Sequence, residues 1–296
     1  MILASIDIGS NAARLLISQV EKYGEKEVDF TKLNLVRIPL QLGFEVFTTG
    51  LISTQKKEML LQTLNAFKIL MTVYQVEEFR VCATSAMRDA KNAKEVIKEI
   101  QDKTDILIEV ITGQEEATII YENHLASLPV KGENLAFIDV GGGSTEITVL
   151  VNNEVSVKES FNIGTIRLLN NQWNNTEWNR MKQFAKTELY NHQPIKIIGS
   201  GGNINKLFSL SKRKEGKPVK LDFFESLFSQ MSQLTLEQRM HEFAMREDRA
   251  NVIVPALHIY IHLLKWSNSN QIFVPKIGLA DGIIKHMYFE RLRNTK

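Results

Sequence analysis

The sequence has one cysteine, six prolines and no marked excess of charge of either sign. Cys82 cannot form a disulfide within its own chain, and nothing in the sequence indicates an oxidising compartment. The 36 Lys and Arg residues almost balance the 34 Asp and Glu residues, which leaves a formal charge of only +2. Binding of nucleic acid by general electrostatic attraction needs a basic excess or stripe. We therefore expect no nucleic-acid partner.

The sequence also lacks a run of about 18 or more apolar residues, the length needed to span a membrane as a helix. Its first residues, Met1-Ile-Leu-Ala-Ser-Ile-Asp-Ile-Gly9, carry no basic leader and place Asp7 inside the apolar stretch, which is unlike a signal peptide. We expect no membrane partner and a cytoplasmic location. Cys82 stands in an apolar run, so we interpret it as a small buried residue.

The chain has 296 residues, 44% of them hydrophobic, which is enough for two domains with sizeable cores. Apolar residues at helical spacing predict a helix over 53–75, with Ser53 as its N-cap. Strand-like runs are expected at 79–84 and 105–111. Later helices are predicted over 176–192, 222–233, 235–243 and 249–266. A domain border is expected near 112, where a strand gives way to an acidic helix start.

Two segments about 130 residues apart resemble each other. Each reads as a buried strand that ends in an aspartate, a glycine turn, and a second strand. The first is Asp7-Ile-Gly9-Ser10-Asn11, and the second is Asp139-Val-Gly141-Gly142-Gly143-Ser144-Thr145. The duplication predicts two similarly built halves.

Glycine turns of this kind let successive backbone N–H groups point at an anion, and the Ser, Asn and Thr side chains add donors. A strand-end aspartate faces a phosphate favourably only through a cation, and Mg²⁺ suits oxygen ligands. A third turn, Gly199-Ser200-Gly201-Gly202, ends a strand and opens a helix, where phosphate binds readily. A single Asp–Gly turn is more often an ordinary hairpin, and the third turn alone is equally consistent with close strand–helix packing. The occurrence of all three in one chain is what favours a phosphate site.

Five motifs in a fixed order resemble the exopolyphosphatase / guanosine pentaphosphate phosphatase family. They are Asp7-Ile-Gly-Ser-Asn11, Ala83-Thr-Ser-Ala-Met-Arg88, Gly113-Gln-Glu-Glu116-Ala, Asp139-Val-Gly-Gly-Gly-Ser-Thr-Glu146 and Gly199-Ser-Gly-Gly202. The resemblance implies an α/β fold with two ribonuclease-H-like domains of the actin–Hsp70–sugar kinase superfamily and an interdomain cleft. It places the first domain at 1–112 with a C-terminal helix from about 283 to 296, and the second at 113–282.

The same resemblance implies roles for individual residues. It makes Glu116 the base that activates water, with Asp139 and Glu146 as catalytic acidic residues. It implies a metal site formed by Asp7, Asp139 and Glu146 for Mg²⁺, or alternatively Mn²⁺. The implied phosphate-binding residues are Asp7, Gly9, Ser10, Asn11, Arg14, Arg88, Gly141, Gly142, Gly143, Ser144, Thr145, Gly199, Ser200, Gly201, Gly202 and Arg249.

Some residues depart from the family's pattern or are given no role. Ala280 and Asp281 stand where the family usually has Arg and Glu, which weakens any transfer of substrate contacts from this region. Glu115 is interpreted as an acid that complements the helix dipole. His258 and His262 are four apart on a predicted helix, but we expect them to serve packing or the surface and not a metal.

The leading hypothesis is an exopolyphosphatase that releases terminal orthophosphate from inorganic polyphosphate. The resemblance to the family also makes a homodimer an expectation. A guanosine pentaphosphate phosphohydrolase is the first alternative, because both substrates present a terminal phosphoanhydride. A phosphotransferase and a non-catalytic nucleotide-binding regulator are further alternatives.

Overall fold

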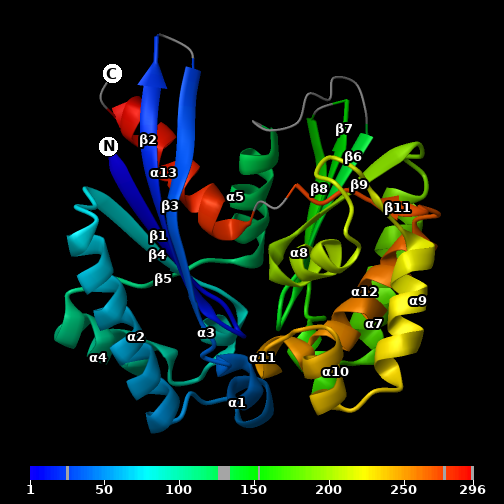
Figure 1. The fold of residues 1–296 in the computed structure, drawn as a ribbon, viewed down its shortest axis with the longest axis horizontal. Helices are drawn as coiled ribbons and strands as arrows, with labels where there is room; N and C mark the ends of the chain where they lie inside the picture. The colour runs from blue at the N-terminus through cyan, green and yellow to red at the C-terminus, as the bar shows by residue number, and fades with distance from the viewer. Residues whose placement is uncertain (25–26, 126–133, 153, 276–277, 295–296) are drawn as a thin grey trace. The chain divides into compact units, whose positions relative to one another are not determined.

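The structure is a computed structural model that describes residues 1–24, 27–125, 134–152, 154–275 and 278–294. The chain forms two compact units (Figure 1). The first comprises Met1–Thr112 and Leu279–Lys296, and the second comprises Gly113–Gly278. The predicted cleft between two domains stays a prediction.

The first unit is built on a five-stranded sheet in the order β3-β2-β1-β4-β5. Its strands are β1 (Ile2–Ile8), β2 (Ala13–Tyr23), β3 (Glu27–Ile38), β4 (Glu78–Ala83) and β5 (Glu109–Val110). The first three strands are antiparallel neighbours, whereas β4 is parallel to β1 and β5 is parallel to β4. Cys82 is fully buried in β4, which confirms its interpretation as a core residue.

Helices α1 (Leu42–Thr49), α2 (Thr54–Val73), α3 (Ser85–Asp89) and α4 (Ala93–Thr104) complete this part of the first unit. Helix α2 begins as predicted, because the Ser53 hydroxyl accepts the N–H of Lys56 at 3.2 Å. It buries Leu60, Leu64 and Phe67, which lie on one helical face. The eight-residue helix α1 was not predicted.

The last helix, α13 (Leu279–Asn294), returns to the first unit, which it joins at Leu279 and not at 283. Its first turn is fixed there by two contacts. The Ser5 hydroxyl of β1 donates to the carbonyl oxygen of Ala280 at 2.8 Å, and Lys32 of β3 pairs with Asp281 at 2.5 Å. The segment that departs from the family's pattern therefore packs against the sheet of the first unit.

The second unit repeats the strand arrangement of the first. Its main sheet has the order β8-β7-β6-β9, formed by β6 (Asn134–Val140), β7 (Thr145–Val151), β8 (Glu154–Phe161) and β9 (Ile195–Ser200). The first three strands are again antiparallel neighbours, and β9 is parallel to β6. A bridge from Ile198 to Phe273 continues the sheet beyond β9. The duplication expected from the sequence is confirmed.

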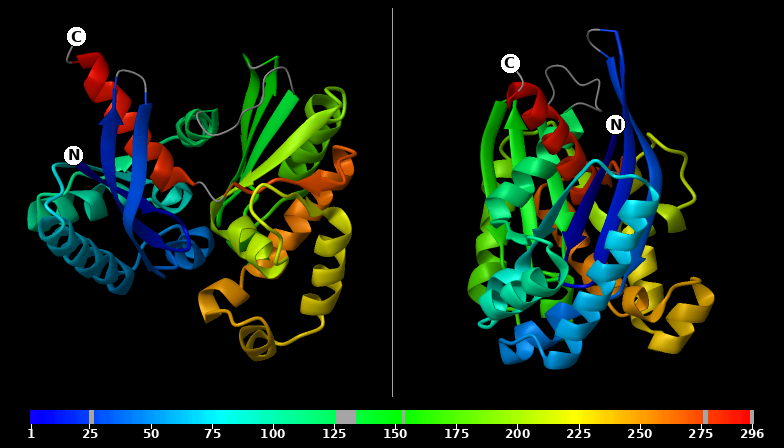
Figure 2. Two further views of the ribbon diagram at one scale, coloured as in Figure 1. Left: turned by 45° about the horizontal axis from the view of Figure 1, so that its top comes forward. Right: turned by 90° about the vertical axis from the view of Figure 1, so that its left-hand side faces the viewer.

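Helices cover both faces of this sheet (Figure 2). They are α5 (Gly113–Leu125), α6 (Thr165–Leu169), α7 (Asn175–Phe184), a π-helical turn (Ala185–Leu189), α8 (Gly201–Leu210), α9 (Leu221–Ser232), α10 (Leu236–Glu242), α11 (Glu247–Ala250) and α12 (Ile253–Trp266). A small sheet pairs β10 (Val219–Lys220) with β11 (Gln271–Ile272).

The helix predicted over 249–266 is wrong as a single element, because the chain forms α11 and then α12. Pro255 explains the break. Proline has no N–H to donate and is tolerated in a helix only within the first turn. Helix α12 accordingly begins at Ile253, which places Pro255 in its first turn.

An aromatic cluster packs beside the core of the second unit. The His258 ring stacks on Trp178 with ring centres 5.3 Å apart and an angle of 22° between the ring planes. Trp266 meets the edge of Trp178 at 5.3 Å, and His262 lies 5.2 Å from the same indole. The packing role expected for the two histidines is confirmed. Burial, and the nearby His262, lower the pKa of His258 to about 4.

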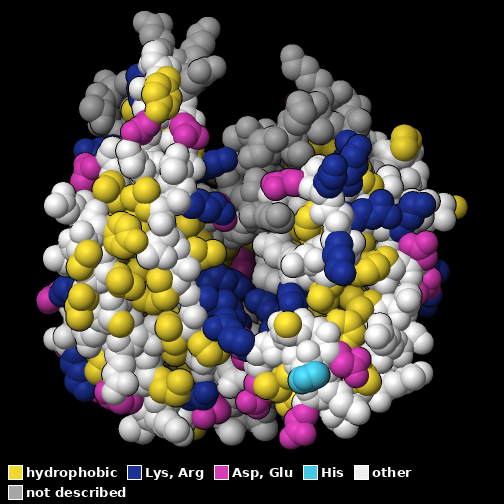
Figure 3. Space-filling view, viewed as in Figure 1, with side chains coloured by type: hydrophobic (Ala, Val, Ile, Leu, Met, Phe, Trp, Pro, Cys, Tyr) yellow, Lys and Arg dark blue, Asp and Glu magenta, His cyan; other side chains and the backbone are white. Residues whose placement is uncertain are grey.

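Several large apolar side chains of the first unit are exposed. Leu35, Ile69 and Val73 expose 55, 65 and 70% of their surface. Figure 3 shows hydrophobic side chains gathered in the region of β3 and α2. A patch of this kind is compatible with a protein interface, but the predicted homodimer stays a prediction. Of the helices that the structure describes, none combines the length and apolar character needed to cross a membrane.

The pKa of His258 predicts how stability depends on pH. An unfolded histidine has a pKa near 6.5, so between about pH 6.5 and 4 the unfolded state binds more protons than the folded state. His258 therefore lowers the stability of the second unit as the pH falls through this range. A His258→Phe variant keeps a ring against Trp178 but cannot take up a proton. Its thermal unfolding midpoint should therefore fall less than that of the wild type as the pH is lowered from 6.5 to 4.

The exposed His241 provides the control. His241→Phe should keep the wild-type pH dependence of the unfolding midpoint. An unchanged decline between pH 6.5 and 4 in His258→Phe would contradict the assignment.

Candidate functional site

The two acidic residues of the longest motif lie side by side in the second unit. Asp139 of β6 is paired directly with Glu146 of β7, so both side chains project from the same face of the sheet. Two serines extend this row, because Glu146 is also paired with Ser160 of β8 and Asp139 with Ser200 of β9. The four side chains form one row across all four strands.

Each carboxylate in the row is oriented by a serine hydroxyl. Ser160 Oγ donates to Glu146 Oε1 at 3.0 Å, and Ser200 Oγ donates to Asp139 Oδ2 at 2.8 Å. Glu146 is buried, whereas Asp139 is partly exposed. The row therefore presents two fixed carboxylates next to each other.

The loop between the two carboxylates is fixed by the start of α6. The N–H groups of Thr165 and Ile166 donate to the carbonyl oxygens of Gly141 and Gly142 at 3.0 and 2.8 Å. Arg167 Nε donates to the Gly143 carbonyl oxygen at 2.7 Å. All three glycine carbonyls are thus bonded to the segment 165–167.

The opposite side of this loop carries N–H groups. In a planar trans peptide the N–H points away from the C=O. The N–H groups of Gly142, Gly143 and Ser144 therefore point away from α6, since the carbonyls that share their peptides point toward it. Successive N–H groups with a common direction form an anion-binding concavity. The geometry of Gly141 to Ser144 is suited to a phosphate group.

Gly164 shows how closely α6 approaches this loop. A Cβ atom at Gly164 would lie 2.4 Å from the Gly142 carbonyl oxygen and 2.5 Å from the Gly143 nitrogen. Backbone atoms cannot accommodate such a contact. Thr145, which follows the loop, is held by its hydroxyl, which donates to the Ile163 carbonyl oxygen at 2.6 Å.

The turn from β9 into α8 contains two glycines with different roles. A Cβ at Gly199 would lie 2.8 Å from Ile204 Cγ1, so this glycine serves close strand–helix packing. Gly201 has a φ of +89°, and its Cβ would lie 2.6 Å from Asp139 Oδ1. Gly201 therefore allows the start of α8 to approach the carboxylate of Asp139. Gly202 continues the first turn of α8.

The start of α5 packs against the same row. A Cβ at Gly113 would lie 2.6 Å from Ser160 Oγ and 3.7 Å from Glu146 Oε1. Glu116 stands three residues further along, on the same face of the helix as Gly113, and is partly buried, whereas Glu115 is exposed. Helix α5 packs against β7 and β8, and Ala117, next to Glu116, is buried.

Arg249 reaches the site indirectly. Arg249 donates to Asn203 Oδ1 at 3.0 Å, and Asn203 Nδ2 donates to the Val140 carbonyl oxygen at 2.9 Å. The Arg249 guanidinium is therefore linked through Asn203 to Val140, the residue between Asp139 and the glycine loop. Its predicted phosphate contact stays a prediction.

In the first unit, Asp7 occupies the position equivalent to Asp139. It is paired with Arg14 of β2, whose Nη1 donates to Asp7 Oδ2 at 2.6 Å. The cation nearest to this aspartate is thus an arginine of its own sheet. Ser10 Oγ shares a hydrogen bond of 2.7 Å with Ser85 Oγ. The turn is closed by Gly9, whose N–H donates to the Ala12 carbonyl oxygen at 3.0 Å.

Two further residues of this unit that are predicted to bind phosphate make hydrogen bonds with backbone groups. The carbonyl oxygen of Asn11 accepts the N–H of Gln41 at 3.0 Å, which fixes the end of the turn. Arg88, at the end of α3, donates from Nη1 to the Ile111 carbonyl oxygen at 2.8 Å. The phosphate-binding roles predicted for Asn11 and Arg88 stay predictions.

The donor set of the second unit fits a hard divalent cation. Mg²⁺ is commonly held by one or two carboxylates together with water and substrate phosphates, and Asp139 with Glu146 supplies such a pair. Among the residues that the structure describes, no group of three or more His, Cys, Asp and Glu side chains is arranged around one point to hold a metal. A Mg²⁺ site does not require three such side chains, because water and substrate phosphates supply the remaining ligands. The predicted metal ligands stay predictions.

Sequence reasoning missed four residues that support this site. They are Ser160, Arg167, Asn203 and Tyr260. Tyr260 is fully buried, which raises the pKa of its hydroxyl well above the usual value, and it donates to the Ser200 carbonyl oxygen at 3.4 Å. The β-strand alternation around Ser160 could have indicated its face, but no local pattern indicated the other three.

Comparison with known proteins decides the family. The model of the Ppx/GppA phosphatase family matches residues 23–290. The chain belongs to the Ppx/GppA phosphatase family. The resemblance inferred from five motifs is thereby confirmed, although the first motif, Asp7 to Asn11, lies before the matched range.

Solved structures of the Ppx/GppA family share the fold over nearly the whole chain. An exopolyphosphatase from Cytophaga hutchinsonii is 25% identical, with a TM-score of 0.82 and coverage of 97% of both chains. The Ppx/GppA family member from Aquifex aeolicus is 27% identical, with a TM-score of 0.77 and coverage of 98% of both chains. The predicted fold class, that of the actin-like superfamily, is confirmed.

Two curated relatives match over part of their length. A bifunctional 3-dehydroquinate synthase/phosphatase of Fusobacterium nucleatum is 33% identical over 232 residues, which are 72% of this chain and 34% of that protein. Exopolyphosphatase 2 of Mycobacterium tuberculosis is 34% identical over 174 residues, 56% of this chain and 53% of that protein. This Ppx/GppA chain thus matches about a third of the first relative and half of the second.

The contact between Gly201 and Asp139 can be tested by a matched pair of substitutions. Gly201 and Gly216 both have positive φ, +89° and +76°, but nothing lies within 4 Å of a Cβ placed at Gly216. Alanine at either position costs about 1–3 kcal/mol of backbone strain. Gly201→Ala should lower the thermal unfolding midpoint further than Gly216→Ala, because its methyl group also collides with Asp139. An equal fall of the unfolding midpoint in the two variants would contradict a destabilising collision between the methyl group and Asp139.

Proposed function

We propose that this protein is an exopolyphosphatase that releases orthophosphate from the end of inorganic polyphosphate. The observation that carries the proposal is the row of Asp139 and Glu146 beside the loop of Gly141 to Ser144, with the start of α5 packed against it. Phosphoryl transfer needs positioning, charge neutralisation and an oriented nucleophile, and this arrangement offers a group for each.

The proposed reaction assigns a separate task to each group. The N–H groups of Gly142, Gly143 and Ser144 bind oxygens of the terminal phosphate. Glu116 accepts a proton from a water molecule, whose oxygen forms a bond to the terminal phosphorus. The bond from that phosphorus to the bridging oxygen breaks, and the shortened chain leaves with the electron pair. Orthophosphate is the second product.

Asp139 and Glu146 would hold Mg²⁺, or Mn²⁺ in its place. The ion would supply charge neutralisation at the phosphate oxygens. Ser160 and Ser200 keep the two carboxylates in position for this task. The roles predicted in the first unit for Asp7, Gly9, Ser10, Asn11, Arg14 and Arg88 belong to the same proposal.

Two observations support polyphosphate as the substrate. The relatives from Mycobacterium tuberculosis and Cytophaga hutchinsonii are both named exopolyphosphatases. In addition, the row and its glycine loop are suited to a terminal phosphate group and need no base-specific contact. Guanosine pentaphosphate presents the same kind of terminal group and is the alternative substrate.

The proposed base can be tested against its neighbour in the same helical turn. Glu116→Gln should reduce kcat for phosphate release from polyphosphate by roughly 10²–10⁴-fold, the usual contribution of a general base. Glu115→Gln removes the same charge from the exposed side of α5 and should leave kcat within about twofold. Phosphate release is measured with saturating Mg²⁺. Near-normal turnover by Glu116→Gln would rule out this base.

Substrate and metal can be tested on the wild-type protein. Phosphate release from long-chain polyphosphate should exceed that from guanosine pentaphosphate at equal concentration, and chelation of divalent cations should abolish both. Addition of Mg²⁺ or Mn²⁺ should restore activity. Faster release from guanosine pentaphosphate would make the nucleotide the substrate. Transfer of labelled phosphate to ADP would indicate a phosphotransferase, and binding without release would indicate a regulator.

A further inference from the structure

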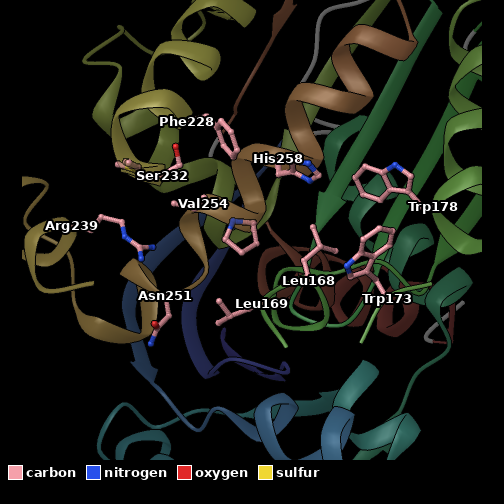
Figure 4. A pocket seen from close by; sticks show the side chains of 12 residues that line it. Leu168, Leu169, Trp173, Trp178, Phe228, Ser232, Arg239, Asn251, Val254 and His258 are labelled. Carbon is pink, nitrogen blue, oxygen red and sulfur yellow. The ribbon is translucent and has the colours of Figure 1, made fainter. Parts of the chain in front are cut away.

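A cavity of the second unit lies among its helices (Figure 4), and no residue of the glycine loop lines it. Its volume is about 420 Å³, within the range of pockets that bind small molecules. Helices α6, α7, α9, α10 and α12 contribute to its walls. None of the residues predicted to bind phosphate or metal lines it.

The walls of this cavity are mostly apolar and partly aromatic. Leu168, Val254 and Phe228 form apolar surface, and two tryptophans stand together on one side (Figure 4). The rings of Trp173 and Trp178 are 5.7 Å apart at their centres and are inclined by 57°. Trp178 is already covered by His258, whereas Trp173 exposes 38% of its surface. Trp173 therefore offers an indole ring on which a flat ligand could stack.

A single cation lies on the other side of the cavity. Figure 4 shows Arg239 across from the tryptophans. Its Nη1 donates to the Ala250 carbonyl oxygen at 2.7 Å, and its Nε makes a long contact of 3.4 Å with the Thr235 carbonyl oxygen. Within the described part of the chain, no carboxylate lies within ion-pairing distance of Arg239. Burial alone lowers the pKa of this guanidinium, which agrees with the lack of an acidic neighbour.

His258 contributes ring surface to the wall of this cavity. Its Nδ1 atom is buried, so a molecule in the cavity does not contact it. The cavity thus combines a stacking surface with one cation that has no acidic partner among the described residues.

We propose that this cavity binds a planar aromatic monoanion of one or two rings, such as an aromatic carboxylate. The ring system packs against Trp173 and the apolar walls, and the acidic group pairs with Arg239. A guanidinium binds a carboxylate through two parallel hydrogen bonds, and the low local polarity strengthens the pairing. A neutral ligand would leave the cation uncompensated, and an aliphatic anion would leave the indole surface unused.

The proposal is tested by calorimetric titration of the full chain with 2-naphthoate. The neutral 2-naphthylmethanol, the aliphatic decanoate and guanosine are titrated in parallel. The protein should bind 2-naphthoate at least about tenfold more tightly than each of the other three. Absence of 2-naphthoate binding, or equal or tighter binding of any of the three, would overturn the proposal.

Two variants locate the bound molecule. Arg239→Gln should weaken 2-naphthoate binding by about 10–100-fold, the loss expected for a hydrogen bond to a charged group. Arg213→Gln, at an exposed arginine outside the cavity, should bind like the wild type. Ser232→Phe keeps Arg239 and its backbone bonds but places a ring at the edge of the cavity, and it should also prevent binding.

Thermal unfolding of each variant shows whether the fold is retained. Binding by Ser232→Phe with wild-type affinity would place 2-naphthoate elsewhere and overturn the proposal. Equal affinity of Arg239→Gln and Arg213→Gln would do the same. Because the cavity contains none of the residues of the proposed hydrolytic site, these results stand whether or not the protein hydrolyses polyphosphate.

Discussion

The candidate site of the second unit is organised around the direct pairing of two acidic residues, Asp139 and Glu146, across neighbouring strands. Like charges directly opposite each other destabilise a sheet, and Glu146 is buried. The unit offsets this cost in part with a serine hydroxyl for each carboxylate. A cation held between the carboxylates, as proposed, would offset it further.

The two units also show how one arrangement can be used in different ways. In the first unit, the aspartate at the end of the first strand is neutralised by Arg14 on the adjacent strand. The acid in the first turn of α13, Asp281, is likewise paired with Lys32. In the second unit, an acid rather than an arginine faces Asp139. The duplicated framework therefore carries a neutralised pair in one unit and two neighbouring carboxylates in the other.

Much of the framework could be predicted from local sequence. The two strand–turn–strand segments, the N-cap at Ser53 and the burial of Cys82 all follow from patterns within a few residues. The contacts that orient the carboxylates could not be found in this way, although Ser200 itself was among the predicted site residues. Ser160 and Ser200 reach Glu146 and Asp139 only through strand register, and Tyr260 reaches the β9 turn from a helix 60 residues further along the chain. The break before α12 was predictable from Pro255 but was not predicted.

Helix α6 has only five residues, and each of its ends meets a different part of the second unit. Its first residues hold the carbonyl oxygens of the glycine loop, and its last two, Leu168 and Leu169, belong to the wall of the aromatic cavity. Thermodynamic linkage requires any influence between two such places to be mutual and equal in free energy. If a ligand in the cavity shifts α6 and thereby changes the affinity of the loop for phosphate, bound phosphate must change the affinity of the cavity for that ligand by the same factor.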